Sequence, residues 1–151
     1  MQCNQSSIRR NQRVIVCARR PKYTRFVTSK NRSQLAAIVD DDRSVLSALK
    51  DLMESAGLSA RCFGSAEEFL ESDERNLTAC LIADIRMPGM SGLELQAKLN
   101  AEGSRIPIIF ITAHGDVKLK MQAMKEGAVE LLSKPFDDEV LLERVQVALR
   151  S

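Results

Sequence analysis

Two acidic residues of this chain follow short apolar runs, an arrangement that brings a carboxylate to the edge of a sheet. Asp84 follows residues 80–83, and Asp40 follows residues 35–39. Apolar runs of this length, bounded by turn residues, are typical of buried strands. In open α/β sheets, ligands bind outside the carboxyl ends of the strands. The two runs therefore predict one shared site.

Two further apolar runs of the chain end in polar side chains that complete the predicted site. The full set is Asp40, Asp41, Asp84, Thr112 and Lys134. Clustered carboxylates repel one another unless their pKa values rise or a cation neutralises them, and an all-oxygen set suits Mg²⁺. The hydroxyl and the ammonium group suit an anion with tetrahedral oxygens. The set therefore suggests phosphoryl transfer, in which a carboxylate attacks phosphorus.

Strand and helix patterns alternate along the chain from Leu35 onward. The expected strands are 35–39, 58–63, 80–84, 106–112 and 128–133, and the expected helices are 43–56, a short helix from 65, 93–101, 117–126 and a last helix after 138. Strict alternation predicts an α/β fold with a doubly wound, five-stranded parallel sheet and helices on both faces. In the helix at 117–126, we expect Met121 and Met124 to be core residues rather than a binding surface.

Charge divides the chain into two segments. Residues 1–34 contain nine basic residues and no acidic one, whereas the remainder contains 13 basic and 20 acidic residues. Such a leader could contact nucleic acid, direct the protein to an organelle, or be an extension without a role. Its scarcity of apolar residues in register favours the last and predicts disorder. The expected folded domain is 35–151.

The remaining composition indicates a protein of the cytoplasm. No apolar stretch approaches the roughly 18 residues that span a bilayer, so we expect no membrane partner. The four cysteines lack the spacing of a zinc site, and we expect reduced thiols rather than a disulfide framework. His114 is the only histidine, and we interpret it as a loop residue rather than a catalyst.

Each polar residue of the predicted site also has an ordinary structural reading. The three consecutive acids at 40–42 could form a solvated turn in which Asp42 caps the next helix. Asp84 could be a turn acid before Pro88, and Lys134 could be a surface lysine before a proline. The functional reading therefore depends on the residues occurring together.

Four segments of the chain together resemble the receiver domains of two-component response regulators. They are Ile38–Asp42, Asp84–Gly92, Ile111–Val117 and Lys134–Phe136, and they occur in the family's order within a match from Leu35 to about Leu149. The stretch Thr-Ala-His-Gly-Asp-Val at 112–117 is similar to the FixJ-type subgroup, whose receivers usually precede a LuxR-type helix-turn-helix domain. The resemblance implies a flavodoxin-like receiver fold and a signalling protein that catalyses only its own phosphorylation and dephosphorylation.

The same resemblance implies a role for each site residue. Asp84 would accept a phosphoryl group from a sensor histidine kinase, and Thr112 and Lys134 would bind that group. Mg²⁺ would be held by Asp40, Asp41, Asp84 and the backbone carbonyl of Arg86.

Phosphorylation would then change the face formed by the fourth helix, the fifth strand and the fifth helix. A homodimer could form through this face. DNA would be reached only through an output domain that is not in this chain, and the alternative is a protein that acts as a single-domain receiver. Leu131 stands where the family commonly has an aromatic ring, so coupling there would require an aliphatic side chain to repack.

Two other functions are compatible with parts of the pattern. A haloacid-dehalogenase-like phosphatase also uses an aspartyl nucleophile and Mg²⁺, but it needs a second acid two residues later, where this chain has Arg86. A receiver-like scaffold that works without phosphate would leave the acids without a catalytic role. Turnover of an external phosphomonoester would indicate the first, and unchanged signalling by Asp84→Asn would indicate the second.

Overall fold

Five parallel strands form the central layer of this computed structural model, which describes residues 34–113 and 117–150. The strands are β2 (Leu35–Val39), β3 (Ser59–Phe63), β4 (Thr78–Asp84), β5 (Ile108–Thr112) and β6 (Glu130–Ser133). They pair in the order β3-β2-β4-β5-β6, and every pair is parallel. Strand order reverses at β2, as it does in doubly wound sheets. The predicted sheet is confirmed.

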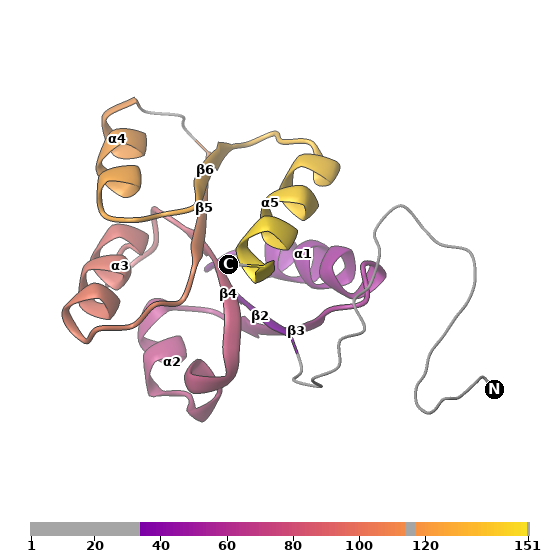
Figure 1. The fold of residues 1–151 in the computed structure, drawn as a ribbon, viewed down its shortest axis with the longest axis horizontal. Helices are drawn as coiled ribbons and strands as arrows, with labels where there is room; N and C mark the ends of the chain where they lie inside the picture. The colour runs from indigo at the N-terminus through magenta and orange to yellow at the C-terminus, as the bar shows by residue number, and fades with distance from the viewer. Residues whose placement is uncertain (1–33, 114–116, 151) are drawn as a thin grey trace. The chain divides into compact units, whose positions relative to one another are not determined.

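Helices cover both faces of this sheet. Figure 1 shows α2, α3 and α4 on one side and α1 and α5 on the other. The helices are α1 (Arg43–Ser55), α2 (Ala66–Glu71), α3 (Gly92–Ala101), α4 (Val117–Lys125), α5 (Asp138–Arg150) and a 3₁₀ turn, η1 (Asp73–Leu77). Every residue of β2 and β5 is buried because both faces are covered, which explains their apolar sequences.

Side chains close the N-terminal ends of three helices. Asp42 accepts a hydrogen bond from the Ser44 N–H at the start of α1. The hydroxyl of Ser65 accepts from the Glu68 N–H at the start of α2. Ser91 and Glu94 form a reciprocal capping box on α3. These caps fix where each helix begins after its strand or loop.

The main error of the sequence analysis concerns α4. Met121 and Met124, expected in the core, are 66% and 39% exposed, while Ala123 is fully buried. With 3.6 residues per turn, α4 carries two apolar stripes on opposite sides. The stripe with Leu119 and Ala123 faces the protein, and the methionines lie on the other. Apolar spacing alone does not distinguish two such stripes.

Smaller differences concern the ends of strands. β4 begins at Thr78, two residues before the predicted start, and η1 was not predicted. β5 begins at Ile108, directly after Pro107, which has no N–H to donate to a neighbouring strand. The expectations for residues 1–33 and for His114 lie outside the described residues. Among the residues that are described, no helix is long and apolar enough to cross a membrane.

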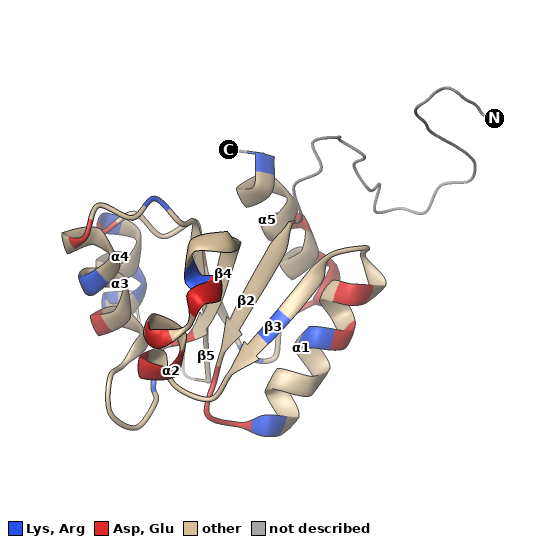
Figure 2. Cartoon of the chain, turned by 90° about the horizontal axis from the view of Figure 1, so that it is seen from below, with Lys and Arg blue, Asp and Glu red and all other residues tan. Residues whose placement is uncertain are grey.

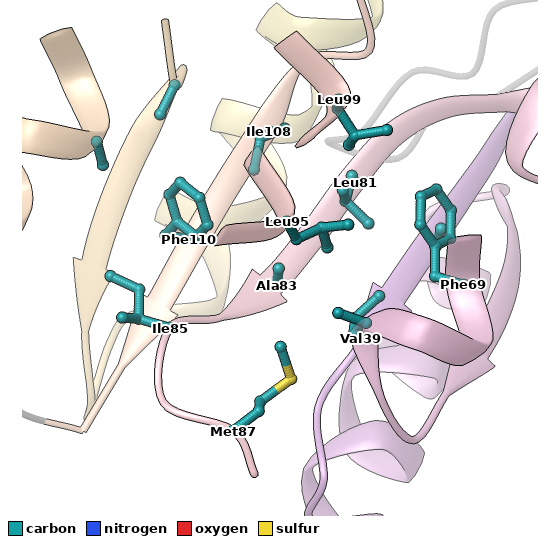
Figure 3. Packing of buried hydrophobic residues seen from close by; sticks show 14 of the residues in the cluster. Val39, Phe69, Leu81, Ala83, Ile85, Met87, Leu95, Leu99, Ile108 and Phe110 are labelled. Carbon is teal, nitrogen blue, oxygen red and sulfur yellow. The ribbon is translucent and has the colours of Figure 1, made fainter. Parts of the chain in front are cut away.

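The core between the sheet and helices α2 and α3 lies directly behind the end of β4. Figure 3 shows side chains of three strands, including Val39, Ala83 and Phe110, facing Phe69 of α2 and Leu95 of α3. Phe69, Phe110 and Leu95 are all fully buried. The end of β4 is therefore held on a rigid surface.

Gly92 at the start of α3 has no room for a side chain. Its N–H donates to the Ile85 carbonyl at 2.8 Å, and an added Cβ would press on the Asp84 carbonyl oxygen and lie 2.9 Å from Ile85 Cα. We expect Gly92→Ala to lower the free energy of unfolding by about 2–3 kcal/mol, since backbone must move. Urea unfolding measures this loss.

Gly64→Ala is the matched control for Gly92→Ala. A Cβ at position 64 would lie 3.5 Å from Glu68 Oε1, an ordinary contact. We expect this variant to stay within about 1 kcal/mol of the wild type. Equal losses in the two variants would show that close packing against β4 is not what requires glycine at position 92.

Candidate functional site

Three carboxylates meet at the carboxyl end of the sheet. Asp40 follows β2, Asp41 is the next residue, and Asp84 is the last residue of β4. One carboxylate oxygen from each lies within 4.8 Å of the other two. Asp40 and Asp84 are buried, and Asp41 is exposed. Figure 2 shows the acidic segment between β2 and α1.

Lys134 reaches the same cluster from the other side of the sheet edge. Its ammonium nitrogen lies 3.9 Å from Asp40 Oδ2. Its backbone N–H donates to the Thr112 carbonyl at 2.8 Å, and its peptide bond to Pro135 is cis. Thr112 is the last residue of β5 and is fully buried. The structure therefore places all five predicted residues at one sheet edge, where the three carboxylates cluster and Lys134 lies beside Asp40.

Burial and mutual repulsion raise the pKa values of the two buried acids. Burial raises the pKa of Asp40 to about 6 from its usual 3.8, and the charges of Asp84 and Asp41 add to this effect. The Asp42 N–H, which donates to Asp40 Oδ1 at 2.9 Å, and the Lys134 charge oppose it. Burial also raises the pKa of Asp84, while Lys134 lowers it. The cluster is therefore costly to ionise in the folded protein.

The donor set fits a small divalent cation. An octahedral Mg²⁺ with bonds of about 2.1 Å spans about 4.2 Å between opposite ligands, close to the spread of these oxygens. A divalent charge would also relieve the repulsion that raises the pKa of Asp40. Asp41 is exposed, so a hydrated ion could reach the cluster from solvent on the side of this carboxylate. The acidic cluster is thus a candidate metal site.

The raised pKa of Asp40 predicts a pH-dependent stability of the metal-free protein. Ionisation of Asp40 lowers the free energy of unfolding, because the folded protein binds this proton more tightly than the unfolded chain does. The stabilisation by the neutral carboxyl is therefore fully present below about pH 4 and is lost as the pH rises through about 6. Asn at position 40 stays neutral at every pH. We therefore expect the free energy of unfolding of Asp40→Asn, relative to that of the wild type, to increase by about 2 kcal/mol between pH 4 and pH 7. Urea unfolding in a chelating buffer measures the difference.

Saturating Mg²⁺ should reduce the advantage of Asp40→Asn at pH 7, because the cation stabilises the ionised wild type. Asn at position 40 can still accept the Asp42 N–H, so the backbone turn is preserved. A difference between the two proteins that is the same at every pH would contradict a titration of Asp40.

Arg86 and the loop around it lie beside the cluster. The Arg86 N–H donates to Asp84 Oδ1 at 3.3 Å, and the Arg86 side chain is exposed. Glu67 of α2 supports the same loop by accepting a hydrogen bond from the Met90 N–H at 3.1 Å. Glu67 was not predicted as a site residue, because no local sequence pattern pairs a helix residue with a loop 23 positions later.

Leu131 occupies a buried place in β6. It is 4% exposed and pairs in register with Phe110 of β5. Both side chains belong to the core beside Ala123 of α4. An aliphatic residue at this position is thus packed in the protein rather than turned outward.

Comparison with known proteins identifies the family of this chain. The model of the response regulator receiver domain matches residues 36–146. The response regulator protein TodT of Pseudomonas putida is 48% identical over 130 residues, which are 86% of this chain and 57% of TodT. The transcriptional regulatory protein FixJ of Azorhizobium caulinodans is 44% identical over 112 residues, which are 74% of this chain and 53% of FixJ.

A solved structure shows the same fold. The crystal structure of FixJ-N has a TM-score of 0.71 and 38% identity, and the match covers 78% of this chain and 94% of that one. The chain spans little more than half the length of the full-length relatives named above. Since the family model covers most of the chain and the relatives are well above 30% identical, the chain belongs to the response regulator receiver domain family, whose members act in phosphorylation-dependent signalling.

Proposed function

We propose that this chain is a switch in which Asp84 accepts a phosphoryl group from the phosphohistidine of a sensor histidine kinase. A carboxylate oxygen of Asp84 forms a bond to phosphorus as the bond from phosphorus to the histidine nitrogen breaks. The observation that carries the proposal is the set of three carboxylates within 4.8 Å of one another, with Lys134 beside them. Asp84 ends a buried strand, which holds the attacking oxygen in place.

Each neighbouring residue has a role in the proposed transfer. Mg²⁺ would be held by Asp40, Asp41, Asp84 and the Arg86 backbone carbonyl, and its charge would screen the negative charge of the entering group. Lys134 pairs with one phosphoryl oxygen, and the Thr112 hydroxyl donates a hydrogen bond to another. Phosphorylation adds about −1.5 to −2 charges and three acceptor oxygens, and the switch responds to this change.

The response is proposed to appear on the face that α4, β6 and α5 share. Glu130 of β6 lies 3.6 Å from the Lys120 ammonium of α4 and 3.4 Å from Arg144 Nε of α5. Val117 and Met121 of α4 are 73% and 66% exposed. A phosphorylation-dependent homodimer would bury them. DNA would be bound only through an output domain outside this chain, and transcription would be the regulated process.

A cytoplasmic location forms part of the proposal. Cys62 and Cys80 are free thiols in the described part of the chain, as expected of a reducing compartment. The sensor kinase remains defined only by its chemistry, as a donor of phosphohistidine.

Intact-mass analysis after incubation with acetyl phosphate tests the proposed function. We expect one added phosphoryl group when Mg²⁺ is present and almost none in a chelating buffer, with peptide mapping placing it on Asp84. Gel filtration of the same samples tests dimerisation. Release of phosphate from an external phosphomonoester, with no stable adduct, would instead support a phosphatase. An unmodified protein that retains its partner binding would support a phosphate-independent scaffold.

A further inference from the structure

The C-terminal end of α4 is capped by backbone hydrogen bonds from the residues that follow it. Gly127 has a positive φ of 104°, and its N–H donates to the Met124 carbonyl at 3.0 Å. The Ala128 N–H donates to the Ala123 carbonyl, also at 3.0 Å. These two bonds form a Schellman motif, which satisfies carbonyls that the helix leaves without partners.

Two side chains of α3 reach the same end of α4. Gln96 and Asn100 lie one turn apart and so share one face of α3. Gln96 Nε2 donates to the Ala123 carbonyl at 3.1 Å, and Asn100 Nδ2 donates to the Glu126 carbonyl at 3.0 Å. Gln96 is only 2% exposed, so breaking this bond would leave a buried amide group without a hydrogen-bond partner, which is energetically costly. We call Gln96 and Asn100 the clamp.

The N-terminal half of α4 borders a pocket lined by described residues. Leu119 is half-buried and lines an open pocket of about 490 Å³ together with Met87, Pro88 and Leu93. Val117 is 73% exposed, and Ala123 is the one buried residue of α4. Lys120, with a half-exposed side chain, connects this half to Glu130 through a surface ion pair, an interaction of small net strength.

We propose that the clamp is a pivot for α4. The C-terminal end of the helix stays bonded to α3, while the N-terminal half swings across the pocket and reorients the exposed Val117 and Met121. The signal that moves the helix rests on the proposed function, whereas the clamp rests on the two hydrogen bonds alone. Gln96 and Asn100 are thus positioning residues that act through α4.

Hydrogen exchange of the unphosphorylated protein tests the clamp. The variant is Gln96→Met with Asn100→Ala, which keeps most of the buried volume and removes both donors. The control is Gln122→Met with Lys98→Ala, at exposed positions of the same two helices. We expect the amides of residues 126–128 to exchange about tenfold faster in the clamp variant and unchanged in the control.

Two results from the unphosphorylated protein would overturn the clamp. One is unchanged exchange of residues 126–128 in the clamp variant. The other is an equal increase across α4 and the central strand β4, which would show a general loss of stability rather than a local release. Asn100→Ala alone, at an exposed position, provides a milder variant should the double substitution prevent folding.

Exchange after phosphorylation tests the pivot. Acetyl phosphate and Mg²⁺ load the protein, and intact mass counts the phosphoryl groups. We expect the wild type to change exchange in residues 117–122 and not in 126–128, and the clamp variant to change both. A wild-type change of equal size in both segments would overturn the pivot. Failure of the wild type to gain a phosphoryl group would overturn the proposed function, and the unphosphorylated comparison would still decide the clamp.

Discussion

Asp84→Asn should abolish phosphoryl transfer to this protein. The substitution removes the nucleophilic oxygen while leaving an acceptor for the Arg86 N–H, so the loop after β4 should keep its form. We expect incorporation from acetyl phosphate to fall at least about 100-fold, since loss of a nucleophile removes the covalent step itself. Intact mass over time measures the rate, and Asp51→Asn on the exposed side of α1 is the matched control.

Loss of activity by misfolding is separable from loss of the nucleophile. The metal-free Asp84→Asn protein should be at least as stable as the wild type, because a buried carboxylate with a raised pKa becomes a neutral amide. A stable variant that still gains a phosphoryl group would show that another side chain is the acceptor. The proposed role of Asp84 would then be wrong.

The fold was predictable because the strands are recognisable from their own apolar sequences. The apolar runs at 35–39 and 108–112 are buried throughout, and their polar ends follow at the same sheet edge. Parallel strands with helical crossovers leave few ways to arrange such runs. The convergence of Asp40, Asp84 and Lys134 followed from this topology before any distance was known.

The features that were not predicted depend on contacts between segments that are distant in the sequence. The exposure of Met121 depends on which stripe of α4 packs on the protein, and both stripes are apolar. The hydrogen bonds from Gln96 to Ala123 and from the Met90 N–H to Glu67 join residues 27 and 23 positions apart, respectively. A glutamine or glutamate in a short helix carries no local sign of such a partner. Periodicity therefore predicts elements well and their lateral contacts poorly.

Lys134 and Asp41 should have opposite effects on Mg²⁺ binding. Lys134 places a positive charge 3.9 Å from Asp40 Oδ2, where it repels an entering cation. We expect Lys134→Met to strengthen Mg²⁺ binding by about 3–10-fold and Asp41→Asn to weaken it by about 10–100-fold. Calorimetric titration with Mg²⁺ measures both. Phosphoryl incorporation should fall in each variant, for Lys134→Met by about 100-fold, because an anion partner is lost.

Lys134→Arg separates the charge of this residue from its support of the backbone. Because Arg retains the positive charge, Mg²⁺ binding should stay near the wild-type value. The wild type, Lys134→Met and Lys134→Arg all keep the backbone hydrogen bond from residue 134 to the Thr112 carbonyl. If Lys134→Met weakened Mg²⁺ binding as Asp41→Asn does, Lys134 would be needed to shape the acidic cluster rather than to receive the anion. Opposite signs would divide the site into a metal side at Asp41 and an anion side at Lys134, as phosphoryl transfer to Asp84 between them requires.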